Sequence, residues 1–224
     1  LNHVFSDNTT GEKLGRLAVI DTETTGLNAE AGDRIIDVAI ATCEYGRDSG
    51  TLYRVVDRYE SLEDPEFPIS PEITKLTGIT DAMVKGQRID EAGMARALSN
   101  VSLVICHNAG FDRPFLEARY PVFAEMHFGC SLHDIPWNAW SLNSSKLDYL
   151  GFRFGLFNDA HRARADIDML VAVLARLAPA SDQSILSILL SNARTPSWRI
   201  YAMGLAYEHM DIARMRGYRW SDGK

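Results

Sequence analysis

The sequence predicts an α/β fold in which helices flank a mixed β-sheet. Two observations lead to this prediction. Three strand-like segments come first, at residues 16–21, 34–45 and 51–57, and strands then alternate with helices along the chain. In the second half, residues 163–178 carry apolar side chains at helical spacing, which indicates a long helix with one face on a core.

Turn and cap residues define the elements of the first half. The segment GRDSG at residues 46–50 is typical of a turn, so the second and third strands are expected to form a hairpin. Ser70, Pro71 and Gly78 suit the N-cap, the first turn and the end of a helix, respectively. A further short helix is expected over residues 90–100.

The following stretch alternates strands with helices. VSLVICHN at residues 101–108 has the apolar pattern of a buried strand, and a helix is expected over residues 111–119. One more strand is expected within residues 129–137. The next helix is expected over residues 145–155, where Gly155 ends it.

The length of 224 residues allows one large domain with an appendage. After Pro179 the pattern changes to a helix over residues 181–194, a strand-like segment at 197–203 and a helix that ends at Arg216. We therefore expect four parts, which are a flexible lead-in at residues 1–15, a main domain at 16–178, a connecting helix or linker at 179–196, and a small α/β module at 197–224.

Composition and charge exclude several classes of protein. With 46% hydrophobic and 24% charged residues the chain is typical of a soluble globular protein, and neither a membrane-spanning run nor a signal peptide is visible. A net charge of −7 argues against bulk electrostatic coating of nucleic acid, although residues 194–224 carry +3. The three dispersed cysteines predict neither a disulfide framework nor a zinc site, so a cytoplasmic location is expected.

Acidic residues stand at the ends of three predicted elements. Asp21 and Glu23 close the first strand, where residues two apart point to the same side and their carboxylates crowd together. Asp112 follows the strand at 101–108, and Asp166 lies in the first turn of the long helix. Mg²⁺ and Mn²⁺ prefer such oxygen ligands, and two ions together stabilise the attacking and leaving oxygens at phosphorus. The sequence therefore predicts a two-metal site that relieves the carboxylate repulsion.

Helical geometry favours Asp166 over its neighbour Asp168 as a metal ligand. Asp166 shares a face with Met169 and Leu170, whereas Asp168 is expected on the solvated surface. His161 lies five residues before Asp166. An imidazole with an ordinary pKa of about 6.5 suits the general base that deprotonates water.

Three segments carry a family resemblance. VIDTETTGL (19–27), CHNAGFDRPFL (106–116) and HRARADIDML (161–170) resemble, in order and separation, the three motifs of the DEDDh exonuclease superfamily. The first segment is closest to the proofreading epsilon subunit of bacterial DNA polymerase III and its free-standing relatives. The resemblance covers about residues 16–178. It implies a ribonuclease-H-like fold and two-metal hydrolysis of nucleic acid from the 3′ end, which releases nucleoside 5′-monophosphates.

The resemblance also implies roles for individual residues. Two Mg²⁺ or Mn²⁺ ions would be held by the four acids Asp21, Glu23, Asp112 and Asp166. Glu23 would in addition place the water, and His161 would be the general base. The 3′-terminal nucleotide would meet Thr24, Gly26, Leu27, His107, Asn108 and Phe111. For His107, a structural role is an equal alternative.

Several alternatives remain open at the level of the sequence. Single-stranded DNA with a 3′ end is the expected substrate, a DNA polymerase or a repair protein is a further expected partner, and both a monomer and a homodimer fit. An exoribonuclease acting on RNA is the alternative within the superfamily, because sugar discrimination depends on the fit of a 2′ hydroxyl. A non-catalytic, polymerase-associated binding module is the alternative from another class, and the presence of all four acids argues against it.

The C-terminal module has two interpretations. Its aromatic residues stand beside arginines, a combination that suits stacking on single-stranded nucleic acid. Alternatively, the same side chains form the small core that such a module needs. The residues concerned are Trp198, Tyr201, Tyr218 and Trp220.

Overall fold

The structure is a computed structural model of the chain, and it describes residues 5–157, 162–196 and 200–218. It divides into two compact units, Leu1–Arg194 and Thr195–Lys224. Among the residues described, none of the helices has the length and apolar character required to cross a membrane.

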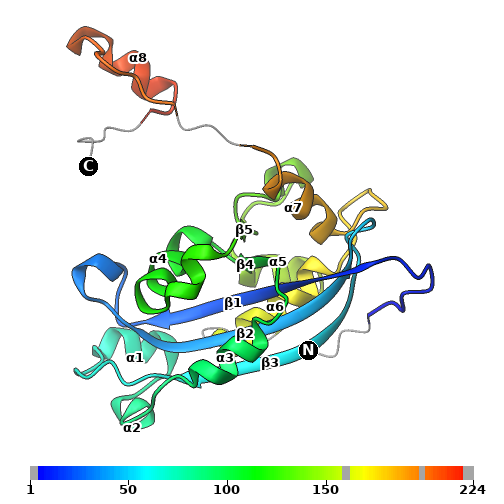
Figure 1. Ribbon diagram of the computed structural model, residues 1–224. Coiled ribbons are helices and arrows are strands. Elements are labelled where there is room, and N and C mark those ends of the chain that lie inside the picture. Colours follow the sequence, from blue (N-terminus) through cyan, green and yellow to red (C-terminus); the bar gives the residue numbers. More distant parts are fainter. Residues whose placement is uncertain (1–4, 158–161, 197–199, 219–224) are drawn as a thin grey trace. The chain divides into compact units, whose positions relative to one another are not determined.

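A five-stranded mixed sheet forms the centre of the first unit, in the order β3-β2-β1-β4-β5 (Figure 1). The antiparallel part consists of β1 (Leu14–Thr24), β2 (Ile35–Gly46) and β3 (Leu52–Leu62). Strand β4 (Leu103–Cys106) pairs in parallel with β1, and β5 (Phe128–Cys130) pairs in parallel with β4. The predicted fold class, an α/β fold around a mixed sheet, is confirmed.

The predicted hairpin joins β2 to β3. The amide of Gly46 donates to the Thr51 carbonyl, and the amide of Gly50 donates to the Gly46 carbonyl. Gly50 adopts a φ of 68°, a left-handed conformation that glycine reaches without steric cost. The first predicted helix is also confirmed, because the Ser70 side chain caps it and Gly78 ends it with a φ of 72°.

Seven α-helices and three short 3-10 turns surround the sheet among the described residues of the first unit. The α-helices are α1 (Pro71–Thr77), α2 (Asp81–Val84), α3 (Glu91–Ala97), α4 (Ala109–Arg119), α5 (Leu147–Arg153), α6 (Ala163–Leu174) and α7 (Ile185–Ala193). The 3-10 turns are η1 (Ala29–Ala31), η2 (Pro121–Glu125) and η3 (Trp137–Trp140).

The two faces of the sheet enter separate hydrophobic cores because side chains alternate along each strand. Leu17 and Val19 of β1 pack with α5, α6 and α7 on one face. Ala18 and Ile20 pack with α3 and α4 on the other. Strands β1 and β2 are therefore covered on both sides, and their sequences are apolar almost throughout.

The N-terminal segment differs from the expected flexible lead-in at residues 1–15. Strand β1 begins at Leu14, and the Glu12 carboxylate accepts hydrogen bonds from the Asp48 and Ser49 amides and the Tyr53 hydroxyl. These partners hold the residues before β1 against the β2–β3 hairpin. The expectation was wrong here because partners more than thirty positions away leave no local signal.

The expected strand within residues 129–137 is shorter and earlier, and only Phe128–Cys130 forms β5. The chain turns directly after it, where the amides of His133 and Asp134 donate to the Cys130 carbonyl. The Asp134 carboxylate in turn accepts from the Cys130 amide. Local side-chain bonding of this kind competes with extension of a strand.

The helix predicted as a connector, α7, belongs to the core of the first unit. Its residues Ile185, Leu186, Leu189 and Leu190 are buried beside α6. Ser184 caps the helix through a bond from the Ser187 amide. The helix is therefore an integral layer of the first unit.

The second unit contains η4 (Tyr207–His209) and α8 (Met210–Met215) among its described residues. The strand expected at 197–203 is absent from residues 200–203, the part of it that the structure describes, so the predicted α/β character is not found there. Tyr201 and Tyr218 are at least partly exposed, and no side chain is buried in residues 200–218. Trp198 and Trp220 lie outside the described residues.

Candidate active site

Three of the four predicted acids converge where β1 meets α6. Asp21 and Glu23 point to the α6 face of the sheet because strand side chains two apart share a face. Asp166 comes from the first turn of α6. One carboxylate oxygen from each residue lies within 4.8 Å of the other two, and all three residues are half-buried. This is the group in the described part of the chain that could hold a metal ion.

Asp112 lies in the first turn of α4 and is buried, but it is not part of this group of three. Its Oδ1 accepts hydrogen bonds from the Thr22 amide at 3.1 Å and from the Thr22 hydroxyl at 2.8 Å. Thr22 thus orients the fourth carboxylate, a role that the sequence analysis missed. This role could have been inferred from the position of Thr22 between Asp21 and Glu23, because successive strand side chains point to opposite faces and Thr22 therefore faces α4.

The carboxylates perturb one another strongly. Burial raises the pKa of Asp21 well above its ordinary value, and the charges of Asp112, Asp166 and Glu23 raise it further. Burial also raises the pKa of Glu23 to about 7, with contributions from the charges of Asp166, Asp37 and Asp112. The pKa of Asp112 rises to about 7 through burial, against the opposing effect of its bonds from Thr22. Gathered carboxylate oxygens of this kind match hard divalent cations, whose charge would relieve the repulsion.

A fifth carboxylate, Asp37, stands beside the cluster and was not recognised in the sequence. It lies directly opposite Glu23 in the β1–β2 register and is fully buried. Its Oδ2 accepts from Arg162 Nε at 3.3 Å. Burial raises the pKa of Asp37 to about 6, although the Arg162 charge opposes this rise. The available signal was an acid inside the apolar run RIIDVAI.

Ion pairs connect the first turns of α6 to the sheet. Arg162 also contacts Glu60 at 3.5 Å, and Arg164 contacts Glu60 at 3.7 Å. Asp168 accepts from Arg58 at 3.0 Å and from Arg164 at 3.2 Å. Asp168 is thus outside the carboxylate group, as expected, and its partly exposed side chain forms ion pairs with arginines from β3 and from α6 itself.

The residues predicted to meet the terminal nucleotide lie on the loop after β1 and on α4. The Thr24 hydroxyl donates to the Gly26 carbonyl at 2.6 Å, and a Cβ at Gly26 would collide with the Asp33 carboxylate. Leu27 is 84% exposed. On α4, the Phe111 ring packs on Phe115 with 5.2 Å between ring centroids.

Asn108 and His107 occupy the junction between β4 and α4. Asn108 is exposed with a φ of 84°, next to the first residue of α4. His107 Nδ1 lies 2.8 Å from Ser131 Oγ, and Nε2 lies 2.9 Å from the Ser145 carbonyl oxygen. A carbonyl only accepts, so Nε2 carries the proton and Nδ1 accepts from the Ser131 hydroxyl. Burial lowers the pKa of His107, which favours this neutral form.

These contacts favour the structural interpretation of His107, since protein partners use both ring nitrogens. The predicted general base, His161, lies outside the described residues.

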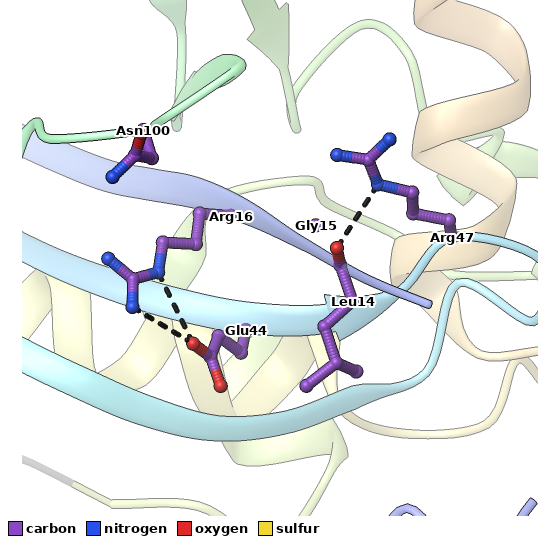
Figure 2. Close-up of a pocket in the computed structure, with 6 residues that line it drawn as sticks. All are labelled: Leu14, Gly15, Arg16, Glu44, Arg47 and Asn100. Carbon is purple, nitrogen blue, oxygen red and sulfur yellow. Dashed lines mark hydrogen bonds and ion pairs between the residues drawn. The ribbon is translucent and has the colours of Figure 1, made fainter. Parts of the chain in front are cut away.

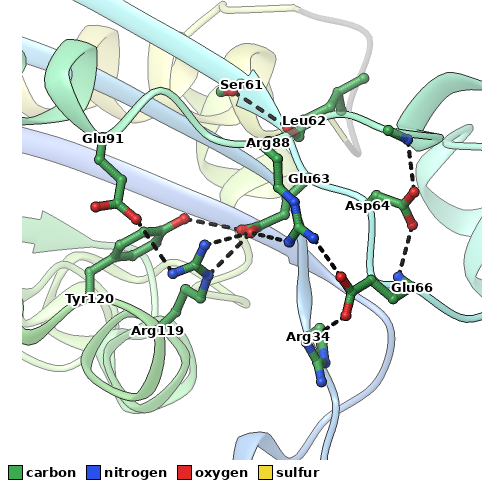
Figure 3. A network of polar contacts seen from close by, with 11 residues as sticks. Arg34, Ser61, Leu62, Glu63, Asp64, Glu66, Arg88, Glu91, Arg119 and Tyr120 are labelled. Carbon is green, nitrogen blue, oxygen red and sulfur yellow. Dashed lines mark hydrogen bonds and ion pairs between the residues drawn. The ribbon is translucent and has the colours of Figure 1, made fainter.

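Other acids of the first unit are compensated by arginine. Figure 3 shows Glu63, whose carboxylate accepts hydrogen bonds from Arg119 and Tyr120 and pairs with Arg88. Glu63 also lines a pocket of about 280 Å³ between residues 29–35 and α4.

A second pocket, of about 270 Å³, lies at the start of β1 (Figure 2). Its Glu44 is held by Arg16, shown in the figure, and by Arg54. This pocket begins at Leu14, seven residues before Asp21 and thus roughly 23 Å along the strand. It is therefore separate from the carboxylate cluster.

The central strand of the mixed sheet thus ends among gathered carboxylates, an arrangement that suits divalent cations. A sequence model of the family described as Exonuclease (RNase_T) matches residues 18–174, and the chain belongs to this family. The matched range contains all four predicted acids, and the resemblance to an exonuclease superfamily is confirmed.

Relatives of the chain include PolC-type DNA polymerases III. The protein from Halalkalibacterium halodurans is 31% identical over 182 residues, which make up 75% of this chain and 12% of that protein. The protein from Listeria welshimeri is 34% identical over 118 residues, or 52% of this chain and 8% of that protein. The chain thus spans about a tenth of the length of these relatives.

Solved structures share the fold. Exonuclease X in complex with 5′ overhanging duplex DNA matches 80% of this chain and 94% of its own, with a TM-score of 0.54 and 24% identity. E. coli exonuclease I in complex with a dA16 oligonucleotide matches 72% of this chain and 40% of its own, with a TM-score of 0.55 and 19% identity.

Proposed function

We propose that this chain is a metal-dependent 3′-to-5′ exonuclease that removes nucleoside 5′-monophosphates from DNA, with a preference for single-stranded ends. The observation that carries the proposal is the group formed by Asp21, Glu23 and Asp166 in a chain of the exonuclease family. The DNA polymerase relatives and the DNA complexes of the structural neighbours support DNA as the substrate.

The four acids Asp21, Glu23, Asp112 and Asp166 would hold two Mg²⁺ or Mn²⁺ ions. Bound divalent ions would supply the positive charge that stabilises the attacking and leaving oxygens of an in-line displacement. Burial and mutual repulsion raise the pKa values of these carboxylates, and a bound cation would favour their ionised forms. The Thr22 bonds fix the orientation of the Asp112 carboxylate before any ion binds.

The remaining residues would orient and activate the reactants. Glu23 would orient the attacking water, and His161 would accept its proton. Leu27 and Phe111 would contact the terminal base, while Thr24 and Gly26 would line its sugar. With both ring nitrogens already bonded, His107 would support the β4–α4 junction, and Asn108 beside it would face the substrate.

Analysis of the products tests this proposal. Single-stranded DNA incubated with the protein and Mn²⁺ should yield nucleoside 5′-monophosphates as the sole small product, and a chelator should abolish their release. The Asp21→Asn variant serves as the inactive control. Release of nucleoside 3′-monophosphates, or of short oligonucleotides only, would contradict the mechanism.

A DNA polymerase or a repair protein is the proposed partner, because the related segments belong to much longer polymerases. The cytoplasm is the proposed location. The described cysteines are all free thiols, which fits a reducing compartment.

A further inference from the structure

Two phenylalanine rings on and just after α5 are turned away from the core. Phe152 of α5 is 63% exposed and Phe157, just after this helix, is 72% exposed. Their ring centroids lie 6.2 Å apart in an edge-to-face arrangement. In contrast, Phe115 and Phe123 fill the core as phenylalanines usually do. A paired, exposed set of rings therefore needs a separate explanation.

An arginine is held beside the two rings. The Arg153 guanidinium lies over the Tyr149 ring, 6.0 Å from its centroid, and Nη1 donates to the Tyr149 hydroxyl at 3.3 Å. No acidic partner of Arg153 occurs within the described ranges. The Arg153 side chain is exposed, and its contact with Tyr149 holds the charge at a defined position. We refer to Tyr149, Phe152, Arg153 and Phe157 as the aromatic platform.

The helix that carries most of the aromatic platform packs against α6, the helix that carries Asp166. Helix α5 approaches α6 closely at Gly151, where a Cβ would collide with the Met169 sulfur. Met169 follows Asp166 by three residues, so the two side chains lie on one face of α6. The contact of α5 with α6 therefore lies about one helical turn from Asp166.

We propose that the aromatic platform is a stacking subsite for bases of the nucleic-acid strand upstream of the scissile bond, with Arg153 at a strand phosphate. The inference rests on the proposed function and extends it to a second contact with the substrate. Aromatic rings stack on any base, and a neighbouring cation follows the backbone, so such a subsite binds single strands without sequence preference.

The size of the surface favours a nucleic-acid strand over a protein. Two phenylalanines, one tyrosine and one arginine offer far less area than the roughly 800 Å² per partner of a stable protein interface. A single unstacked base needs only one ring face.

Binding without hydrolysis provides the direct test. A 5′-fluorescein-labelled oligo(dT) is titrated in Ca²⁺, and anisotropy is recorded for the wild type and for the Phe152→Ala/Phe157→Ala double variant. The dissociation constant of the double variant should rise about tenfold. Phe67→Ala, which removes another exposed ring outside the platform, is the matched control and should bind as the wild type does.

Two further measurements locate the effect. Hydrolysis of thymidine 5′-(p-nitrophenyl phosphate), which lacks an upstream strand, should be unchanged in the double variant. Abasic sites upstream of the terminal nucleotide should weaken binding by the wild type and leave the double variant unaffected, as expected for coupled partners.

Three results would overturn the proposal. These are an unchanged dissociation constant, an equal loss of oligonucleotide binding and of ester hydrolysis, and a change in oligomeric state with intact oligonucleotide binding. If the wild type binds DNA through the platform but hydrolyses nothing, the subsite stands and the proposed exonuclease function fails.

Discussion

At the scale of single residues, Asp166 and Asp168 make a matched pair on one helix. Asp166 joins the carboxylate group, whereas arginines hold Asp168. We expect saturating Mn²⁺ to raise the melting temperature of the wild type by about 5–10 °C, since binding at 100 times Kd contributes about 2.7 kcal/mol. Asp166→Asn should lose most of this rise and Asp168→Asn should keep it. Thermal unfolding with and without Mn²⁺ measures this rise for each variant. If Asp166→Asn shows the same rise as the wild type, Asp166 is not a metal ligand.

The role of His161 can be separated from metal binding. His161→Ala should retain the Mn²⁺-dependent rise in melting temperature, because imidazole is not among the predicted ligands. Its turnover of single-stranded DNA should fall by at least about 100-fold, which is a typical contribution of a general base. Steady-state kinetics provides the measurement, and near-normal turnover would refute the assignment.

The raised pKa values make metal binding dependent on pH. The pKa values of Glu23 and Asp112 lie near 7, above their ordinary values of 4.5 and 3.8. Without metal, the folded chain therefore binds more protons than the unfolded chain between about pH 4 and 7. These groups contribute less stability as pH rises through that interval.

Metal should reverse this trend, because a bound cation favours the ionised carboxylates. We expect the Mn²⁺-dependent rise in melting temperature to be small at pH 6 and large at pH 8. A rise of equal size at both values would show that these carboxylates are already ionised at pH 6.

The convergence of Asp21, Glu23 and Asp166 could be predicted because each stands at the end of an element that its own neighbours define. Asp37 was missed although it interrupts an apolar run, and its pairing with Arg162 could not be predicted because the two residues are 125 positions apart in the chain. The hydrogen bonds of His107 could not be predicted for the same reason, because Ser131 and Ser145 are distant in the sequence and come close to His107 only in the folded protein.

At the scale of elements, the ion pair between the buried Asp37 carboxylate and the partly exposed Arg162 anchors the start of α6. Arg162→Met leaves a buried carboxylate unpaired and should lower the free energy of unfolding by up to about 3 kcal/mol at pH 8. The loss should be smaller at pH 5, because Asp37, with a pKa of about 6 even when paired, then becomes protonated. Urea unfolding at the two pH values measures both effects.

The Asp37→Leu/Arg162→Met double variant should recover most of the lost stability, since no buried charge then lacks a partner. Arg96→Met, at an exposed arginine on α3, is the control and should change little. A destabilisation of equal size at pH 5 and pH 8 would show that a lost contact, and not the unpaired charge, is responsible.

Elements with local signals could be predicted well. The cap of α1 at Ser70 and the glycine turn of the hairpin lie within the elements they define. Strand β1 extends beyond the expected residues 16–21 because pairing with β2 continues at both ends. Such pairing depends on residues that are distant in the sequence, so the β-propensity of the strand itself does not predict where the strand ends.

At the scale of the whole molecule, α7 sets the limit of the first unit. We propose that the exonuclease domain extends to residue 194 and not to 178. A chain of residues 1–194 should keep the melting temperature of the full chain, because α7 and its core contacts are retained.

A chain that ends at residue 178 should not fold. It loses four buried side chains, each contributing about 1.5–3 kcal/mol, and their sum is comparable to the stability of a domain. Circular dichroism of the two fragments compares them directly. A folded 1–178 fragment would show that α7 is dispensable.

The polarity of digestion tests the central claim most directly. Single-stranded DNA and RNA of one sequence, each labelled at the 5′ end, are incubated with Mg²⁺, Mn²⁺ or a chelator and resolved on a denaturing gel. We predict a metal-dependent ladder that shortens from the 3′ end, stronger on DNA, and absent for Asp166→Asn. Immediate release of the labelled 5′ nucleotide, or a ladder that persists in the chelator, would contradict the proposed function.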